Sequence, residues 1–164
     1  MDQRMIKAAL LLLLGLTAGS TLRAEEVSPT QAEAVRQGVQ TTLDAYRELS
    51  AAGQWDALLR LYADDPHFWW VTSGVVVSRS VDEIRKYFTE LPAGTRIETT
   101  YQNTEIIPVT PGVAEVVTSF QTRLVDPKSG GFSFGGMLTM TLVQRGDGWK
   151  ILSGHASSPT RREG

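Results

Sequence analysis

The chain has 164 residues, with 18 acidic and 16 basic side chains and a formal net charge of -2 at pH 7. This mildly acidic balance argues against a nucleic-acid groove or a cationic membrane surface, because such surfaces concentrate lysine and arginine on one face. The chain contains no cysteine, which excludes disulfides, thiol catalysis and thiolate metal sites.

A secretory signal is the first element that the sequence predicts. Basic residues, an apolar run from Ala8 to Leu16 and small residues ending at Ala24 follow one another. The apolar run is too short to span a bilayer, so we expect residues 1–24 to be removed as a signal peptide. A cut after Ser20 and an uncleaved tethering helix are the alternatives. The mature protein is then periplasmic or secreted, without stable membrane insertion.

A long helix follows at the start of the mature chain. Ser28, Pro29 and Gln31 form the pattern of a capping box with a first-turn proline, and the helix should run to about Ala52. Apolar residues recur at helical spacing and should form its buried stripe: Val35, Val39, Leu43, Tyr46 and Leu49.

Shorter elements come next in the chain. Helical spacing, turn residues and a second capping box predict, in order, a helix from Trp55 to Asp64, a hairpin of Phe68–Val71 and Val75–Val77, and a helix opened by Ser80 and Glu83.

The second half of the chain is rich in β-forming residues separated by turns. It predicts four strands, Arg96–Ile107, Val113–Val125, Phe132–Arg145 and Trp149–Ser157. Their short connections require antiparallel pairing. Gly135 and Gly136 fall inside the third of these strands, where glycine predicts a bulge or bend. We therefore expect an α+β fold over residues 25–158, with a curved, antiparallel-rich sheet wrapped round three helices and a flexible tail at 159–164.

The order of these elements and three segments carry a family resemblance. Gly53–Leu59 (GQWDALL), Tyr62–Asp65 (YADD) and Gly148–Ser157 (GWKILSGHAS) together resemble the nuclear-transport-factor-2-like superfamily, and the closing tryptophan and His-x-Ser resemble its SnoaL-like branch. The resemblance covers Gln31 to Ser157. It implies a cystatin-like cone, open at one end, that suits a small apolar ligand. The superfold hosts several enzyme classes and transport factors, so it does not fix the function.

The resemblance also bears on one reaction. In ketosteroid isomerases of the superfamily, a tyrosine and a carboxylic acid polarise the substrate carbonyl while an aspartate moves the proton. An ungapped match places Tyr46 at the tyrosine position but Trp70 at the aspartate position, and no carboxylate occurs between Phe132 and Arg145. Because that isomerisation needs a positioned base, we do not expect it here.

Aromatic residues supply the candidate ligand-binding wall. Trp70 either fills the cone or offers a stacking surface, and simple core packing is the alternative for each aromatic side chain. The residues expected to bind a ligand are Tyr46, Phe68, Trp70, Phe88, Tyr101 and His155.

The two histidines, His67 and His155, are the side chains best suited to proton exchange near neutral pH. Regular alternation along the last strand would place His155 on the same face as Trp149 and Ile151, towards the cone. A role in catalysis or binding competes with a structural histidine that locks the end of the sheet. His67 fits a partly exposed structural position at a strand entrance.

Other chemistry has less support. Asp64 and Asp65 could join the two histidines as metal ligands, but no metal-binding spacing links them, and aspartates before a proline commonly form turns. Ser157 lacks the glycine pattern of a nucleophile elbow. We predict no metal and no cofactor.

Three functions remain open, and catalysis is not decided. We favour an exported protein that binds a small apolar or aromatic molecule in the cone. An isomerase, dehydratase or cyclase that uses His155 and Tyr46 is one alternative, and an oligomerising association domain is the other. We expect a homodimer formed through the outer face of the sheet, where small and β-branched residues could pair with a twofold mate: Thr118, Thr122, Thr139 and Thr141. No nucleic-acid partner is expected.

Overall fold

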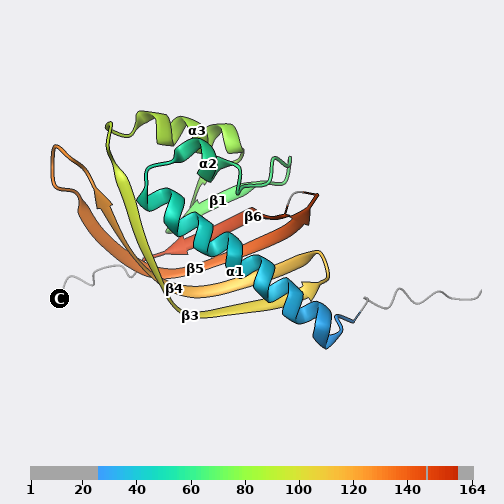
Figure 1. Ribbon diagram of the computed structural model, residues 1–164. Helices are drawn as coiled ribbons and strands as arrows, with labels where there is room; N and C mark the ends of the chain where they lie inside the picture. The colour runs from blue at the N-terminus through green and yellow to red at the C-terminus, as the bar shows by residue number, and fades with distance from the viewer. Residues whose placement is uncertain (1–25, 147, 159–164) are drawn as a thin grey trace, which may run out of the picture.

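The computed structural model describes residues 26–146 and 148–158 (Figure 1). The predicted signal peptide, 1–24, and the predicted tail, 159–164, lie outside these ranges. The elements follow the predicted order: α1 (Pro29–Ala51), α2 (Trp55–Leu59), β1 (Trp69–Thr72), β2 (Val75–Ser78), α3 (Val81–Glu90), β3 (Arg96–Thr110), β4 (Val113–Val125), β5 (Phe132–Arg145) and β6 (Gly148–Ser157). The predicted α+β class is confirmed.

Both predicted helix caps form. The Ser28 hydroxyl accepts from the Gln31 amide at 3.3 Å, and the Gln31 side chain accepts from the Ser28 amide at 2.9 Å. At α3, the Ser80 hydroxyl accepts from the Glu83 amide at 3.2 Å, but the Glu83 carboxylate accepts from Arg79 instead of Ser80. Each cap satisfies an amide that the first helical turn leaves unpaired, and this contributes about 1 kcal/mol.

One six-stranded sheet joins all the strands in the order β2-β1-β6-β5-β4-β3. Strands β3 to β6 form the predicted antiparallel meander. β1 pairs with β6 in parallel, with Trp69 opposite Ser153, so the early hairpin extends the late meander. The hairpin turn itself uses left-handed backbone at Ser73, with φ 48, and Gly74, with φ 83. Such a turn matches the twist of the strands that it connects.

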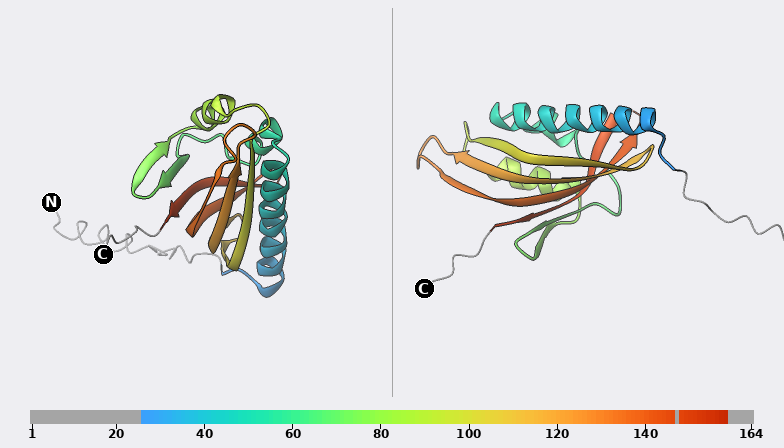
Figure 2. Two further views of the ribbon diagram at one scale, coloured as in Figure 1. Left: turned by 90° about the vertical axis from the view of Figure 1, so that its left-hand side faces the viewer. Right: turned by 90° about the horizontal axis from the view of Figure 1, so that it is seen from below.

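Helix α1 lies along one face of the curved sheet, which we call the concave face (Figure 2). Val35, Val39 and Leu43 are buried against it, as their spacing predicts. A Cβ at Gly38 would collide with the indole of Trp149, so glycine in mid-helix lets the helix approach the sheet. The Thr42 hydroxyl donates to the Trp149 carbonyl oxygen at 3.2 Å.

The two glycines in β5 do not mark a bulge. The β4–β5 register runs without a shift from Leu124 opposite Phe132 to Val113 opposite Val143. A Cβ at Gly136 would instead collide with the Ser157 carbonyl group. Of the two predicted alternatives, a bulge or a bend, the bulge is excluded, and Gly136 instead permits a close approach of the backbone.

A bulge lies in β6 at Leu152. Thr141 pairs with Ser153 and Leu142 pairs with Ile151, so Leu152 has no partner across the strand. This extra residue reverses the alternation of the side chains that follow. Ile151 is fully buried before the bulge, and Gly154 is buried after it.

The bulge overturns one expectation about the last strand. His155 is exposed on the convex face, opposite to Trp149 and Ile151. Regular alternation was the wrong premise, since the bulge adds one residue between Ile151 and His155.

The four outer-face threonines also divide between the two faces. Thr118 and Thr122 are buried on the concave face, where their hydroxyls meet those of Thr104 at 2.8 Å and Thr99 at 2.9 Å. Thr139 is exposed, and it pairs with His155 on the convex face. The expectation for the two β4 threonines was wrong, because threonine in a strand can be buried once its hydroxyl has a partner.

Candidate functional site

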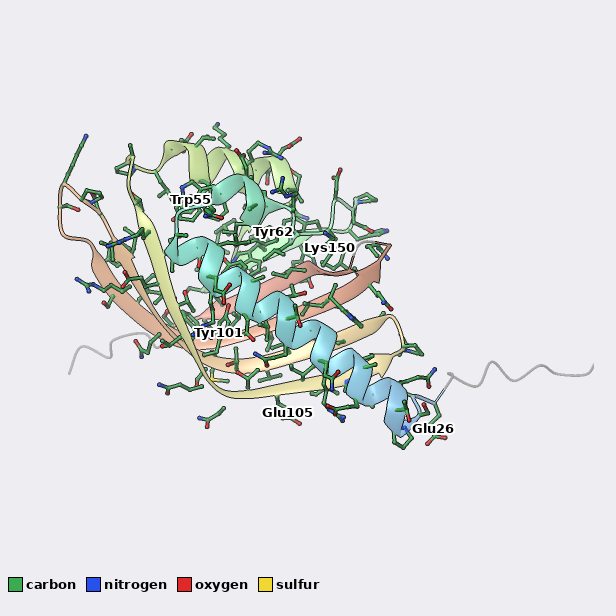
Figure 3. The ribbon with its side chains drawn as sticks, viewed as in Figure 1. Glu26, Trp55, Tyr62, Tyr101, Glu105 and Lys150 are labelled. Atoms are coloured by element: carbon green, nitrogen blue, oxygen red, sulfur yellow. The ribbon has the colours of Figure 1, made fainter. Side chains whose placement is uncertain are left out.

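Tyr46 and Tyr62 are in contact, and Tyr87 and Tyr101 lie near enough to act on the pKa of this pair; we call the four residues the tyrosine cluster. Tyr46 comes from α1, Tyr62 follows α2, Tyr87 comes from α3 and Tyr101 from β3. Figure 3 labels Tyr62 and Tyr101. The Tyr46 and Tyr62 hydroxyls are 3.2 Å apart, and their rings meet edge to face with centroids 6.2 Å apart. Elements distant in the sequence thus bring several phenols together.

Burial keeps these phenols protonated. It is the main reason that the pKa of Tyr46, of Tyr62 and of Tyr101 lies above the ordinary tyrosine value. At Tyr46 the hydrogen bond from Tyr62 lowers the pKa and so opposes burial, whereas Tyr46 raises the pKa of Tyr101. Because burial is the largest cause at each of the three, Tyr46, Tyr62 and Tyr101 present neutral O–H groups at physiological pH.

The hydrogen bonds of the cluster leave donors free. A phenol has one proton to donate, and the Tyr46–Tyr62 pair uses only one of its two protons internally. Within the described residues, the Tyr101 hydroxyl makes no hydrogen bond. Tyr46 and Tyr101 are half-buried, whereas Tyr62 is only 6% exposed. Two O–H donors thus remain available next to largely apolar surroundings.

Aromatic rings form the surroundings of Tyr62. Phe68 and Trp70 both meet it edge to face, with centroid distances of 5.7 and 6.2 Å. Phe68 is buried, and Trp70 is half-buried with its indole directly over Gly154, where a Cβ would overlap the ring. A buried aromatic floor and a partly open indole therefore adjoin the phenols.

The six residues expected to bind a ligand are only partly brought together. Tyr46, Phe68 and Trp70 meet around Tyr62, and Tyr101 is close enough to affect the pKa of Tyr62. Phe88 stacks on Trp55 with ring centroids 4.8 Å apart, and its ring contact with the tyrosine cluster is to Tyr87. His155 lies on the other face of the sheet. That a ligand contacts these six residues stays a prediction.

The ligand-binding set missed two tyrosines. Tyr62 lies at the centre of the aromatic contacts, and Tyr87 is 51% exposed at the edge of the cluster. The YADD segment contained a signal for Tyr62, because a tyrosine directly after an apolar helix stripe points towards the core. No comparable signal identified Tyr87, which helical spacing places beside Phe88.

Two hollows lie along the seam between α1 and β3. The smaller, of about 440 Å³, is lined by Arg47, Glu98 and Arg123 among others, and the larger, of about 710 Å³, is lined by Glu33, Arg36 and Glu105 among others. Neither is lined by a residue of the predicted ligand-binding set. Arg47 donates to the Thr99 carbonyl oxygen at 3.3 Å, which covers part of the open edge of β3.

The Asp65 carboxylate forms a turn. It accepts from the His67 amide at 2.9 Å and from Arg145 at 2.9 Å. The His67 amide is the main cause of a lowered Asp65 pKa, and Arg145 adds to it.

Among residues 26–146 and 148–158, no three potential metal-ligating side chains cluster. No helix in these ranges is both long and apolar enough to cross a bilayer.

Comparison with known families shows which family this chain belongs to. The sequence profile of the SnoaL-like domain matches residues 39–161. The chain belongs to the SnoaL-like family. No match is found among the curated proteins.

Solved structures share the fold of this SnoaL-like chain. A nuclear transport factor 2-like superfamily protein from Salmonella enterica has a TM-score of 0.66 at 16% identity, and the match covers 80% of this chain and 98% of that one. A putative scytalone dehydratase from Novosphingobium aromaticivorans has a TM-score of 0.69 at 14% identity, covering 81% and 89%. A putative calcium/calmodulin-dependent protein kinase II association domain from Xanthomonas campestris has a TM-score of 0.63 at 19% identity, covering 85% and 96%. These likenesses show the nuclear-transport-factor-2-like fold.

Proposed function

We propose that this SnoaL-like protein binds a small, neutral, largely apolar molecule at the tyrosine cluster. The observation that carries the proposal is the contact of Tyr46 with Tyr62 in an aromatic setting, with the O–H groups of Tyr46 and of nearby Tyr101 left free to donate. A ligand oxygen that accepts from Tyr46 or Tyr101 would satisfy a donor that apolar neighbours cannot. The indole edge of Trp70 and the phenol of Tyr62 would contact the apolar body.

The charge of the site limits the ligand further. The residues in ring contact with Tyr62 are Tyr46, Phe68 and Trp70, and none of them carries a charge. A carboxylate or ammonium placed against these three rings would lose its hydration without gaining a counter-charge from them. The charge that does act on the cluster is the Arg47 guanidinium, which lowers the pKa of Tyr101. Neutral ketones, esters and quinones therefore fit better than ions.

Binding has more support than catalysis. The enzyme alternative paired Tyr46 with His155, but the bulge at Leu152 puts the two on opposite faces of the sheet. Proton transfer needs a base within hydrogen-bond reach of the reacting atom. The likeness to a putative scytalone dehydratase is compatible with a ligand-binding interior and adds no catalytic residue.

A fluorescent ketone tests the binding site. Prodan is a neutral naphthyl ketone whose emission reports the polarity around it, and we expect its emission to shift to the blue when the protein is added. Tyr46→Phe and Tyr101→Phe should each weaken prodan binding by about 2- to 10-fold, because each removes one hydrogen bond worth about 1 kcal/mol. Ser133→Ala, which removes an exposed hydroxyl from β5, is the control and should leave the affinity unchanged. Equal affinities for all three variants and the parent would reject the site.

We also propose that the protein is exported after removal of residues 1–24, on the strength of the basic start, short apolar run and small-residue exit. Amino-terminal sequencing of protein recovered from the periplasm or medium should begin at Glu25. Cytoplasmic protein that keeps Met1 would contradict export.

A homodimer through the convex face is the third proposal. Trp69 and Met137, each 47% exposed, lie on this face, and the residues of α1 to α3 that join the core cluster pack against the opposite one. Exposed apolar side chains on one face of a sheet are a feature of association surfaces. Thr139→Arg should weaken the dimer, since it would bury a charge without a partner. A monomeric mass at all concentrations would reject the dimer.

A further inference from the structure

We propose that the ligand of the tyrosine cluster is a neutral carbonyl compound with a long apolar tail, and that this tail lies along three phenylalanines of β4 and β5. These residues are Phe120, Phe134 and Phe132, and we call them the phenylalanine strip. The inference rests on the proposed ligand site and adds the class of its ligand. The strip starts in the core opposite Tyr101 and ends at exposed positions.

The strand register connects the strip to the tyrosine cluster. Phe120 of β4 lies opposite Tyr101 of β3, and both residues pack in the same hydrophobic core. Side chains of directly opposite residues project from the same face of a sheet and are close neighbours. The Phe120 ring therefore shares the concave face with the phenol of Tyr101, whose O–H group is free to donate.

Ring contacts continue the strip from β4 along β5. Phe134 meets Phe120 edge to face with centroids 5.9 Å apart, and Phe132 meets Phe134 at a tilt with centroids 5.7 Å apart. Phe132 and Phe134 are two residues apart in one strand, so they project from the same face. Three rings thus form a continuous apolar row that leads away from Tyr101.

Exposure increases along this row. Phe120 is 5% exposed, Phe134 is 39% exposed and Phe132 is 61% exposed. The first ring completes the core, whereas the other two leave much of their surface open. Exposed apolar side chains that touch one another, unlike single ones, mark places where a ligand or a partner binds. The outer two rings are therefore the part of the strip that a ligand can cover.

The hairpin between β4 and β5 holds the outer ring in place. Figure 1 shows this hairpin, in orange, curving up at the left of the view. Gly131 has left-handed backbone with φ 79, and a Cβ there would collide with the carbonyl group of Leu124, the residue opposite Phe132. The Asp126 carboxylate accepts from the Lys128 amide at 2.8 Å and from the Ser129 hydroxyl at 2.7 Å. Such local contacts place the rings before a ligand arrives, which lowers the ordering cost of binding.

A small molecule fits this row better than a second copy of the chain. The strip lies on the concave face, on the same side of the sheet as α1. A folded partner would have to insert part of its surface into that curve, whereas an alkyl or aryl tail can lie along a single row of rings. The tail gains contact with aromatic surface while the carbonyl oxygen accepts from Tyr46 or Tyr101. Long-chain ketones and esters therefore match both parts of the surface.

Displacement of prodan by a series of methyl ketones tests this inference. The ketones from 2-heptanone to 2-undecanone share one carbonyl group and differ only in the length of the alkyl tail. We expect the dissociation constant to fall by about twofold for each added methylene group. This is less than the about fourfold change that complete burial of a methylene group gives, because the outer rings stay partly exposed to solvent.

Variants of the strip should change this dependence on chain length. Phe132→Ser should leave the affinity for 2-heptanone unchanged and remove most of the gain that the longest ketones show. Phe134→Ser should weaken binding from a shorter ketone onwards, since Phe134 lies nearer to the phenols. Phe132→Trp keeps an aromatic ring and should retain the dependence. Val109→Ser removes an apolar side chain that is 50% exposed at the other end of β3, and this control should behave as the parent does.

The outcomes separate the strip from the ligand site itself. Prodan binding that is absent, or that Tyr46→Phe and Tyr101→Phe leave unchanged, would overturn the ligand site and the role of the strip with it. Equal affinities of the parent for all the ketones would overturn the long tail and leave the site standing. A folded Phe132→Ser variant, checked by circular dichroism, that keeps the dependence of the parent would overturn the strip. The same result together with a lower mass in solution would assign Phe132 to an interface between copies.

Discussion

The two faces of one sheet carry different kinds of side chain on the same strands. In β5, Leu138, Met140 and Leu142 are buried on the concave face, while Thr139, between two of them, is exposed on the convex face. The concave face gathers phenols and aromatic rings, and the convex face presents hydroxyls, one histidine and the exposed side chains of Trp69 and Met137. Because side chains alternate between the two faces along a strand, one inserted residue moves the side chains that follow from the face of the proposed ligand site to the face of the proposed interface.

Hydroxyl groups illustrate the difference. The Thr118 side chain is fully buried, and its hydroxyl meets both the Thr104 hydroxyl and the Gln102 carbonyl oxygen. Thr139 has no such role and stays in contact with solvent. The same residue type thus completes the core on one face and leaves the other free for association.

Substitutions around the bulge of β6 should show the largest difference in their effect on the free energy of unfolding. Ile151→Ala removes a fully buried side chain and should lower the free energy of unfolding by about 2–5 kcal/mol. Leu152→Ala, at the half-buried bulge position, should cost about 1 kcal/mol. Urea unfolding of the two variants measures the contrast. Equal losses would mean that the bulge does not separate the faces as described.

A second test concerns the contact of Gly154 with Trp70. Gly154→Ala places a methyl group against the indole and should cost about 1–3 kcal/mol by overpacking. In a Trp70→Leu background the added methyl group has room, so the same change should cost at least about 1 kcal/mol less. Thermal and urea unfolding of the four proteins of this cycle give the coupling energy. Strict additivity would contradict the contact.

Substitutions of Thr118 and Thr139 should have smaller effects on stability that differ between the two residues. Thr118→Val leaves the Gln102 carbonyl oxygen and the Thr104 hydroxyl without their partner and should cost about 1 kcal/mol. Thr139→Val changes an exposed group and should stay within about 0.5 kcal/mol of the parent. A larger loss at Thr139 in the dimer alone, absent under monomeric conditions, would place it in the interface.

The smallest expected effect on stability appears only at acid pH. The folded-state pKa of Asp65 is lowered, so its contribution to stability is complete above the ordinary aspartate pKa of about 4 and is lost as the pH falls towards the folded value. Asp65→Asn should therefore flatten the loss of stability below pH 4 in acid unfolding. Asp64→Asn, at the exposed neighbouring position, is the control. If the free energy of unfolding fell equally steeply with decreasing pH in Asp65→Asn and in the parent, the contacts of the Asp65 carboxylate in this turn would be contradicted.

Local signals predicted most of the elements. The capping patterns at Ser28 and Ser80 and the turn residues between strands act within a few positions, and the helices and strands follow them. The meander followed as well, because short connections allow only antiparallel neighbours. The four aromatic residues around Tyr62 could be selected, although not their mutual contacts.

Long-range contacts decided the rest. The parallel pairing of β1 with β6 joins distant parts of the chain, and no local pattern specifies that partner. The bulge lies at Leu152, where two adjacent apolar residues, Ile151 and Leu152, interrupt the alternation of the strand. Which of the two is left unpaired depends on the register with β5, so the face of His155 could not be deduced from the sequence. Side-chain parity in a strand has a period of two, and one unpaired residue inverts everything beyond it. The sequence thus determined which elements form and their order, although α2 ends at Leu59 rather than at Asp64. The tertiary structure decided which face each functional side chain occupies.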